Sequence, residues 1–192
     1  MTKNNSTKNT GSAKITGPTV LTILRMILSV AFVIFACFPE LWARIVALVL
    51  FVVAAITDQI DGKWARDKKL VTDLGAFLDP LADKMLINLA FLVFVSSGVI
   101  PLWVFAIILV RDFAVDGMRM MAARSGITIS ASIFGKLKTV FQMIALIIIL
   151  SNQIFNLEFL DIIGNIVLYI ALALTVFSGS DYLIKGWKLV IK

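Results

Sequence analysis

The sequence contains no histidine and only one cysteine, Cys37, among its 192 residues. Without imidazole, the chain has neither histidine metal ligands nor histidine acid–base catalysis, so catalysis must use carboxylates, lysine or metal-bound groups. A single cysteine excludes a disulfide within the chain. Charged residues are also scarce, at 16% of the sequence. The few charged side chains are therefore the main source of information about chemistry.

What remains is mostly apolar. Hydrophobic residues make up 60% of the sequence, and the mean hydropathy is +0.98. These values exclude an ordinary soluble domain and indicate a polytopic membrane protein. The net charge of +6 would suggest nucleic-acid binding in a soluble protein. In a membrane protein it is better explained by cytoplasmic loops and anionic lipid, so we expect membrane lipid and no nucleic acid as a partner.

The apolar segments predict six transmembrane helices. We expect them at residues 20–38, 41–65, 74–97, 101–123, 132–150 and 159–184. Residues 1–14 are polar and predicted to be disordered, which leaves residues 15–192 as one transmembrane domain. A cleaved signal peptide is the alternative for the first segment, but Arg25 interrupts it and more segments follow. The late fifth segment and the sixth are interpreted as generic apolar sequence.

Basic residues gather at one of the two ends of these segments. One end collects Lys3, Lys8, Lys14, Arg66, Lys68, Lys69, Arg119, Arg124, Lys185, Lys188 and Lys192. The other end has Arg44 as its only nearby basic residue. Because cytoplasmic loops are enriched in Lys and Arg, we predict a multi-pass protein of the cell membrane with both termini on the cytoplasmic side.

Four aspartates form two pairs with helical spacing. Asp58 and Asp61 are three residues apart, and Asp79 and Asp83 are four apart, so each pair lies on one helix face. A carboxylate at membrane depth costs ~2.5–3.5 kcal/mol. Four of them would cost roughly 10 kcal/mol, which is comparable with a whole domain's stability of ~5–15 kcal/mol. Surface acids on a loop are the alternative. We prefer a site for one or two hard divalent cations.

Basic residues form a second polar group in the fourth and fifth segments. Arg111 follows Pro101 by ten residues, which places it roughly 15 Å into the bilayer. Arg119 shares its helix face. Asp112 points about 100° away from Arg111, so we expect a bound phosphate to be the better partner for Arg111. Snorkelling and local Arg–Asp pairing are the alternatives. The fifth segment carries a polar face of its own, formed by Gly135, Lys138, Thr139 and Gln142.

The predicted fold class follows from these patterns. It is an all-α integral membrane protein, a bundle of six transmembrane helices with a polar cavity that faces the cytoplasm. Acids lie on two of the helices and bases on two others, so the cavity should have a metal end and an anion end.

The aspartates belong to a pattern of eight fixed positions: Asp58-x2-Asp61-Gly62-x2-Ala65-Arg66-x8-Gly75-x3-Asp79-x3-Asp83. It resembles the signature of the CDP-alcohol phosphatidyltransferases without a gap or substitution. Residues 18–25 also resemble the start of that family, except that Thr19 stands where asparagine is usual.

The resemblance implies a membrane enzyme in which an alcohol displaces CMP from a CDP-linked substrate. It further implies a homodimer and Mg²⁺ or Mn²⁺, with two ions expected. The metal ligands would be Asp58, Asp61, Asp79 and Asp83, with Asp83 also the catalytic base. The residues expected to bind the CDP-lipid are Thr22, Gly62, Ala65, Arg66 and Gly75.

Within the family, the basic residues are most similar to those of members whose acceptor is glycerol 3-phosphate. This implies that CDP-diacylglycerol and glycerol 3-phosphate give phosphatidylglycerophosphate and CMP. The residues expected to bind the acceptor phosphate are Arg25, Arg111, Arg119, Lys136, Lys138 and Thr139. Asp112 stands where glutamate is expected. Acceptors of other family members, namely phosphatidylglycerol, inositol phosphate and serine, are alternatives. A cation transporter is an alternative of another class, although we find no internal repeat.

Overall fold

The computed structural model of the chain describes residues 17–68, 73–124 and 133–190. The predicted disordered segment 1–14 lies outside the described residues. The described residues form six α-helices: α1 (Gly17–Ala36), α2 (Leu41–Lys68), α3 (Asp73–Ser96), α4 (Leu102–Arg124), α5 (Ile133–Phe155) and α6 (Glu158–Val190). The prediction of an all-helical chain is confirmed, and each helix overlaps one predicted segment.

Two helices continue five or more residues beyond their predicted ends. We expected α5 to end at residue 150, but it ends at Phe155. The polar residues there do not break the helix, because Ser151 donates its hydroxyl to the carbonyl of Ile147 at 2.8 Å. The chain turns at Asn156, whose φ of 49° is the left-handed conformation typical of helix ends. Similarly, α6 extends past residue 184 to Val190, since a helix need not stop where its apolar sequence does.

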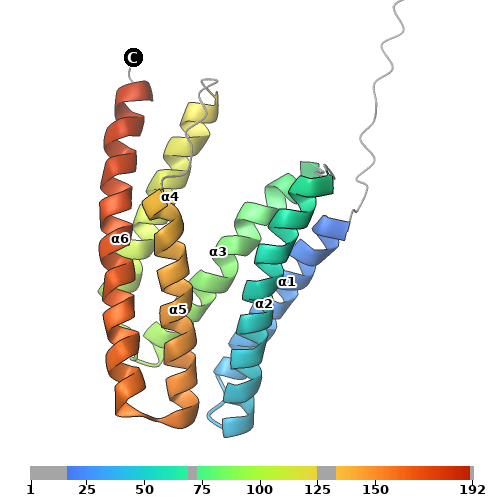
Figure 1. Cartoon of the computed structure of the whole chain (residues 1–192), viewed down its shortest axis with the longest axis vertical. Coiled ribbons are helices and arrows are strands. Elements are labelled where there is room, and N and C mark those ends of the chain that lie inside the picture. Colours follow the sequence, from blue (N-terminus) through green and yellow to red (C-terminus); the bar gives the residue numbers. More distant parts are fainter. Residues whose placement is uncertain (1–16, 69–72, 125–132, 191–192) are drawn as a thin grey trace, which may run out of the picture.

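The helices run alternately up and down, and their ends gather at two poles (Figure 1). The start of α1, the end of α2, the start of α3 and the ends of α4 and α6 lie at one pole, shown at the top. The short connections 37–40, 97–101 and 156–157 lie at the other. The helix ends that carry the predicted basic residues therefore lie at the first pole.

The helices pack as two groups of three. α1 contacts α2 and α3 extensively, and α6 contacts both α5 and α4. The groups meet where α2 contacts α5 and where α3 contacts α4 and α5, over smaller areas. Small residues allow close approach, as expected for helices in a membrane. On α2, for example, Ala43, Ala47 and Ala54 are fully buried. Aromatic pairs fill the wider gaps, with the rings of Phe32 and Phe51 centred 5.5 Å apart.

Large apolar side chains also cover the outside of the bundle. Val110, Phe113 and Phe159 are each about two-thirds exposed. Such a surface is typical of contact with lipid rather than water.

Three helices are long and apolar enough to cross a membrane, among the residues that the structure describes. These segments are residues 19–36, 133–155 and 158–180. Two shorter apolar stretches lie within α2 and α3, at residues 41–57 and 84–96. The charged residues of α2, α3 and α4 lower their mean hydropathy. The structure therefore supports a membrane protein with three clear candidate spans.

Candidate functional site: a basic cavity between α3, α4, α5 and α6

A cavity of about 410 Å³ lies between α3, α4, α5 and α6. Its charged lining consists of five basic and two acidic residues: Lys84, Arg111, Arg119, Lys136, Lys138, Asp112 and Asp116. The lining therefore has three more positive than negative charges. Five of the six residues predicted to bind the acceptor phosphate line this one cavity, namely Arg111, Arg119, Lys136, Lys138 and Thr139.

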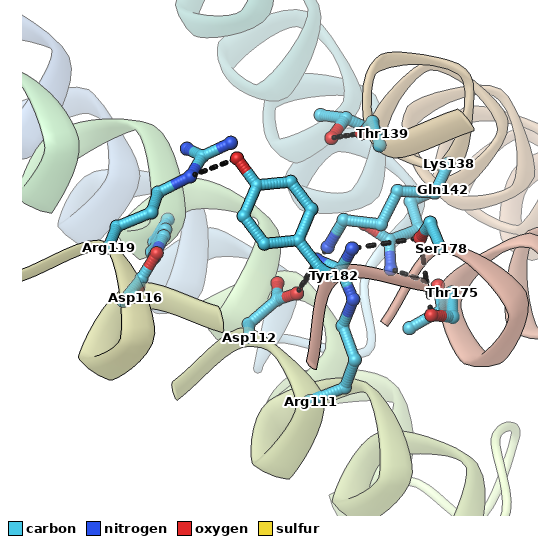
Figure 2. Close-up of polar contacts among 12 residues, drawn as sticks. Arg111, Asp112, Asp116, Arg119, Lys138, Thr139, Gln142, Thr175, Ser178 and Tyr182 are labelled. Atoms are coloured by element: carbon cyan, nitrogen blue, oxygen red, sulfur yellow. Dashed lines mark hydrogen bonds and ion pairs between the residues drawn. The ribbon is translucent and has the colours of Figure 1, made fainter. Parts of the chain in front are cut away.

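Asp112 pairs with two basic side chains of the cavity, Arg111 and Lys138 (Figure 2). Its Oδ1 accepts a hydrogen bond from Arg111 Nη1 at 3.0 Å, and it also pairs with Lys138 Nζ from α5. The three side chains are 12%, 15% and 7% exposed for Arg111, Asp112 and Lys138, respectively. A buried charge must be paired to be tolerated. One carboxylate pairs with two cations here, so Arg111, Asp112 and Lys138 together carry one excess positive charge.

This pairing corrects one expectation. We expected Asp112 to point about 100° away from Arg111 and therefore to be a poorer partner than a bound phosphate, whose binding stays a prediction. The structure instead shows the local Arg–Asp pair. A 100° difference in direction along the helix is bridged because the arginine side chain is long and flexible.

Nearer the end of α4, Arg119 and Asp116 each have a partner on another helix. Arg119 Nε donates to Tyr182 Oη at 3.0 Å, and its guanidinium carbon lies 5.0 Å from the centre of the Tyr182 ring. Asp116 pairs with Lys84 of α3, so this ion pair links α4 to the group of helices formed by α1, α2 and α3.

Two further predicted residues belong to α5. Lys136 is exposed, whereas Thr139 is half-buried and donates its hydroxyl to the carbonyl of Gly135 at 3.4 Å.

The sixth helix contributes a polar face to the site, which corrects its interpretation as generic apolar sequence. Ser178 Oγ accepts a hydrogen bond from Arg111 Nη2 at 2.8 Å. Gln142 of α5 donates to Thr175 Oγ1 at 3.5 Å, and both are buried. The signal was present in the sequence, because Thr175, Ser178 and Tyr182 follow the i, i+3, i+7 spacing of one helix face. We did not recognise this face because its three polar residues are widely spaced in an otherwise apolar segment.

The predicted metal ligands occupy neighbouring helices. Asp58 and Asp61 lie on α2, and Asp79 and Asp83 lie on α3, and these two helices are in contact. The four side chains are outside the residues whose side chains the structure describes. Among the described side chains, no group of three or more Asp, Glu, Cys or His is placed to hold a metal ion. The donor set fits Mg²⁺ or Mn²⁺, because both prefer carboxylate oxygen.

The structure describes the side chain of one of the residues predicted to bind the CDP-lipid, Thr22. Thr22 of α1 is buried, as is Arg25, the sixth predicted acceptor ligand. Both belong to α1, which packs against α2 and α3. Among the described residues, Arg25 is not part of the cavity lining. Of the remaining predicted residues Gly62, Ala65, Arg66 and Gly75, the structure describes only the helical backbone of α2 and α3.

Comparison with known proteins adds an independent observation. The chain is 35% identical over 184 residues to a CDP-diacylglycerol–glycerol-3-phosphate 3-phosphatidyltransferase of Bacillus subtilis, with 89% of this chain and 95% of the relative covered. A protein of the same name from Yersinia enterocolitica is 37% identical, with 89% and 94% covered. A probable phosphatidylglycerophosphate synthase of Mycobacterium tuberculosis is 36% identical, with 87% and 79% covered.

A family-level match covers most of the chain. The sequence model described as CDP-alcohol phosphatidyltransferase matches residues 15–177, which include the four aspartates and all the basic residues of the cavity. The resemblance that the aspartate pattern indicated is thereby confirmed. This chain belongs to the CDP-alcohol phosphatidyltransferase family.

Proposed function

We propose that this chain transfers the phosphatidyl group from CDP-diacylglycerol to glycerol 3-phosphate, giving phosphatidylglycerophosphate and CMP. The observation that carries the proposal is the cavity of five basic and two acidic side chains. Its excess of three positive charges suits an acceptor that brings its own phosphate dianion. It suits serine less well, because serine carries no net charge. The names of the relatives support the same acceptor.

The acceptor's phosphate would bind among Arg111, Arg119 and Lys138, with Lys136 and Thr139 at the rim. Arg111 already donates one hydrogen from each terminal nitrogen, to Asp112 and to Ser178. Each of these nitrogens carries a second hydrogen in the same plane, and a phosphate accepts such parallel pairs well. The low exposure of Arg111 and Lys138 strengthens these charged hydrogen bonds.

The CDP-lipid would bind at the α1–α3 side. Thr22, Gly62, Ala65, Arg66 and Gly75 are the residues expected to contact it. The four aspartates would hold Mg²⁺ or Mn²⁺. When bound, the ions would neutralise the pyrophosphate and the leaving CMP.

In the reaction, the acceptor's hydroxyl oxygen attacks the phosphorus that carries the diacylglycerol. A new P–O bond forms, and the bond from that phosphorus to the bridging oxygen breaks. The electron pair leaves with the phosphate of CMP. We assign the hydroxyl proton to the carboxylate of Asp83.

The arrangement in the membrane is part of the proposal. All six helices would cross the bilayer, with the cavity and both termini facing the cytoplasm. The basic residues at the pole where α2, α4 and α6 end support this orientation. Membership of the family further leads us to propose a homodimer, which cross-linking in native membranes would test.

The test is CMP release from CDP-diacylglycerol by the purified protein with a panel of alcohols. We expect release with glycerol 3-phosphate, and far less with glycerol, serine, inositol phosphate or phosphatidylglycerol. Equal use of glycerol and glycerol 3-phosphate would show that no phosphate pocket exists. A preference for inositol phosphate or phosphatidylglycerol would assign the chain to another acceptor.

A further inference from the structure

Three residues of α6 contact the two arginines of the cavity, although the family resemblance gave α6 no role. Ser178 accepts from Arg111 Nη2 at 2.8 Å. Tyr182 accepts from Arg119 Nε at 3.0 Å and places its ring 5.0 Å from the guanidinium carbon. The third residue, Gly179, faces the side chain of Arg111. Figure 2 shows the hydrogen bonds from Arg111 to Ser178 and from Arg119 to Tyr182.

Gly179 makes room for the aliphatic part of Arg111. A Cβ atom at residue 179 would lie 2.6 Å from Arg111 Cγ and 3.1 Å from Nε. The first of these distances is shorter than carbon atoms tolerate, so any larger residue would displace Arg111. The clash involves the base of the arginine side chain rather than its flexible end. A shift there would therefore move the whole guanidinium.

Ser178 fixes the direction of the guanidinium. Its hydroxyl donates to the carbonyl of Thr175 at 3.3 Å, which orients the lone pairs of its oxygen toward Arg111. On the other side, Asp112 holds Nη1 at 3.0 Å. The planar guanidinium is thus held at both terminal nitrogens, and its remaining N–H groups have a defined direction.

We propose that α6 positions the acceptor-binding arginines: Ser178 and Gly179 orient Arg111, and Tyr182 orients Arg119, so that both present N–H groups to the acceptor's phosphate. This inference rests on the proposed function. Ser178, Gly179 and Tyr182 are positioning residues, since they act through the arginines. Loss of their contacts should weaken binding of the phosphorylated acceptor and leave the CDP-lipid site intact.

The chain offers matched controls for two of the three residues. Ser180 lies on the same helix and also donates to a helix carbonyl, that of Val176 at 3.0 Å, but it is exposed and away from the cavity lining. Gly117 is a helical glycine with open space where a Cβ would lie. Ser178→Ala is therefore compared with Ser180→Ala, and Gly179→Ala with Gly117→Ala.

The experiment measures KM and kcat for glycerol 3-phosphate and for CDP-diacylglycerol in detergent-solubilised protein. Ser178→Ala should raise the acceptor KM about tenfold, the typical effect of losing a hydrogen bond to a charged group. Gly179→Ala should raise it at least as much. Tyr182→Phe keeps the ring but loses the oxygen, and it should raise the same KM. The KM for CDP-diacylglycerol should stay within about twofold, and both controls should match the wild type.

The outcomes separate this inference from the proposed function. A wild-type protein that releases no CMP with glycerol 3-phosphate would overturn the proposed function, and this inference with it. Wild-type turnover combined with no difference within each matched pair would overturn the inference alone. A proportional rise of both KM values in the α6 variants would also overturn it, because the contacts would then serve only to hold the helices together.

Discussion

Asp112 and Arg111 are the residues on which the geometry of the cavity depends most directly. One oxygen of Asp112 bonds both Arg111 and Lys138, which come from different helices. Arg111 in turn uses its two terminal nitrogens for partners on α4 and α6. The single nitrogen of lysine does not reproduce the planar fork that reaches both partners, so the position should require arginine rather than positive charge alone.

This requirement gives a prediction for Arg111→Lys. Lysine keeps the charge but loses the fork, so kcat/KM for glycerol 3-phosphate should fall tenfold or more, equivalent to ~1.4 kcal/mol or more. Steady-state kinetics with both substrates measures this. Arg44→Lys is the control, because Arg44 lies at the opposite pole, where its Nη1 donates to the carbonyl of Gln153 at 2.7 Å. Equal activity of Arg111→Lys and the wild type would contradict a directional role for the guanidinium.

The aspartates give a second prediction at this scale. Asp58→Asn and Asp79→Asn should each abolish CMP release while the protein still inserts and purifies normally, because a neutral amide binds a hard divalent cation poorly. Chelation of divalent ions should abolish wild-type activity, and added Mg²⁺ or Mn²⁺ should restore it. Full activity after chelation would refute the metal role.

Asp83 should behave differently from the other aspartates. If it is the base, Asp83→Asn should lose turnover but still bind the CDP-lipid, because the base acts on the hydroxyl of the acceptor rather than on the CDP-lipid. Equilibrium binding of CDP-diacylglycerol to Asp58→Asn and Asp83→Asn makes the comparison. Equal loss of binding in the two variants would make Asp83 mainly a metal ligand.

At the scale of the elements, α5 and α6 form the most extensive contact in the described part of the bundle. A Cβ at Gly164 of α6 would lie 3.2 Å from Ile149 Cγ1 and 3.3 Å from Ile148 Cγ2 on α5. The small residue therefore sets how closely the two helices approach. Because α6 also supports Arg111 and Arg119, this spacing bears on the cavity as well as on stability.

Gly164→Leu should accordingly lower the stability of the protein. A leucine does not fit at this separation, and overpacking typically costs ~1–3 kcal/mol. The midpoint of thermal unfolding in detergent should fall relative to the wild type. Gly117→Leu provides the comparison, since nothing lies within 4 Å of the corresponding Cβ. Similar midpoints for the two variants would show that the α5–α6 spacing adapts freely.

At the scale of the whole molecule, the two poles differ in charge. The cavity residues Arg119 and Lys136 lie toward the pole where α2, α4 and α6 end. Cys37 follows the end of α1 at the other pole and is exposed. The single native cysteine is thus a natural reporter of which pole faces outward.

Labelling of sealed, right-side-out vesicles with a membrane-impermeant thiol reagent tests the orientation. The wild type should be labelled at Cys37 from outside, because positive charge keeps the opposite pole in the cytoplasm. In a Cys37→Ser background, Asn152→Cys should be labelled and Lys68→Cys should not, until the vesicles are opened. Labelling of Lys68→Cys in sealed vesicles would invert the proposed topology.

Much of the fold could be predicted from the sequence because its signals are local. Apolar length gave the six helices, and the ends of α1 to α4 fell within about three residues of their predicted positions. Helical spacing alone puts Asp58 with Asp61 and Asp79 with Asp83. Their metal role stays a prediction. Interrupted hydropathy also explains why α2, α3 and α4 are less clear as spans than α1, α5 and α6.

The order of residues along each helix is enough to predict an apolar helical protein with an aspartate pattern on α2 and α3 and bases on α4 and α5. Which side chains meet depends on how the helices pack against one another. The pairing of Lys84 with Asp116, the contact of Ser178 with Arg111 and the clearance at Gly179 depend on how each helix is rotated and which helix lies beside it. In this chain both the inside and the outside of the bundle are apolar, so periodicity does not identify the buried face. Close packing of small residues and the need to pair buried charges select it instead.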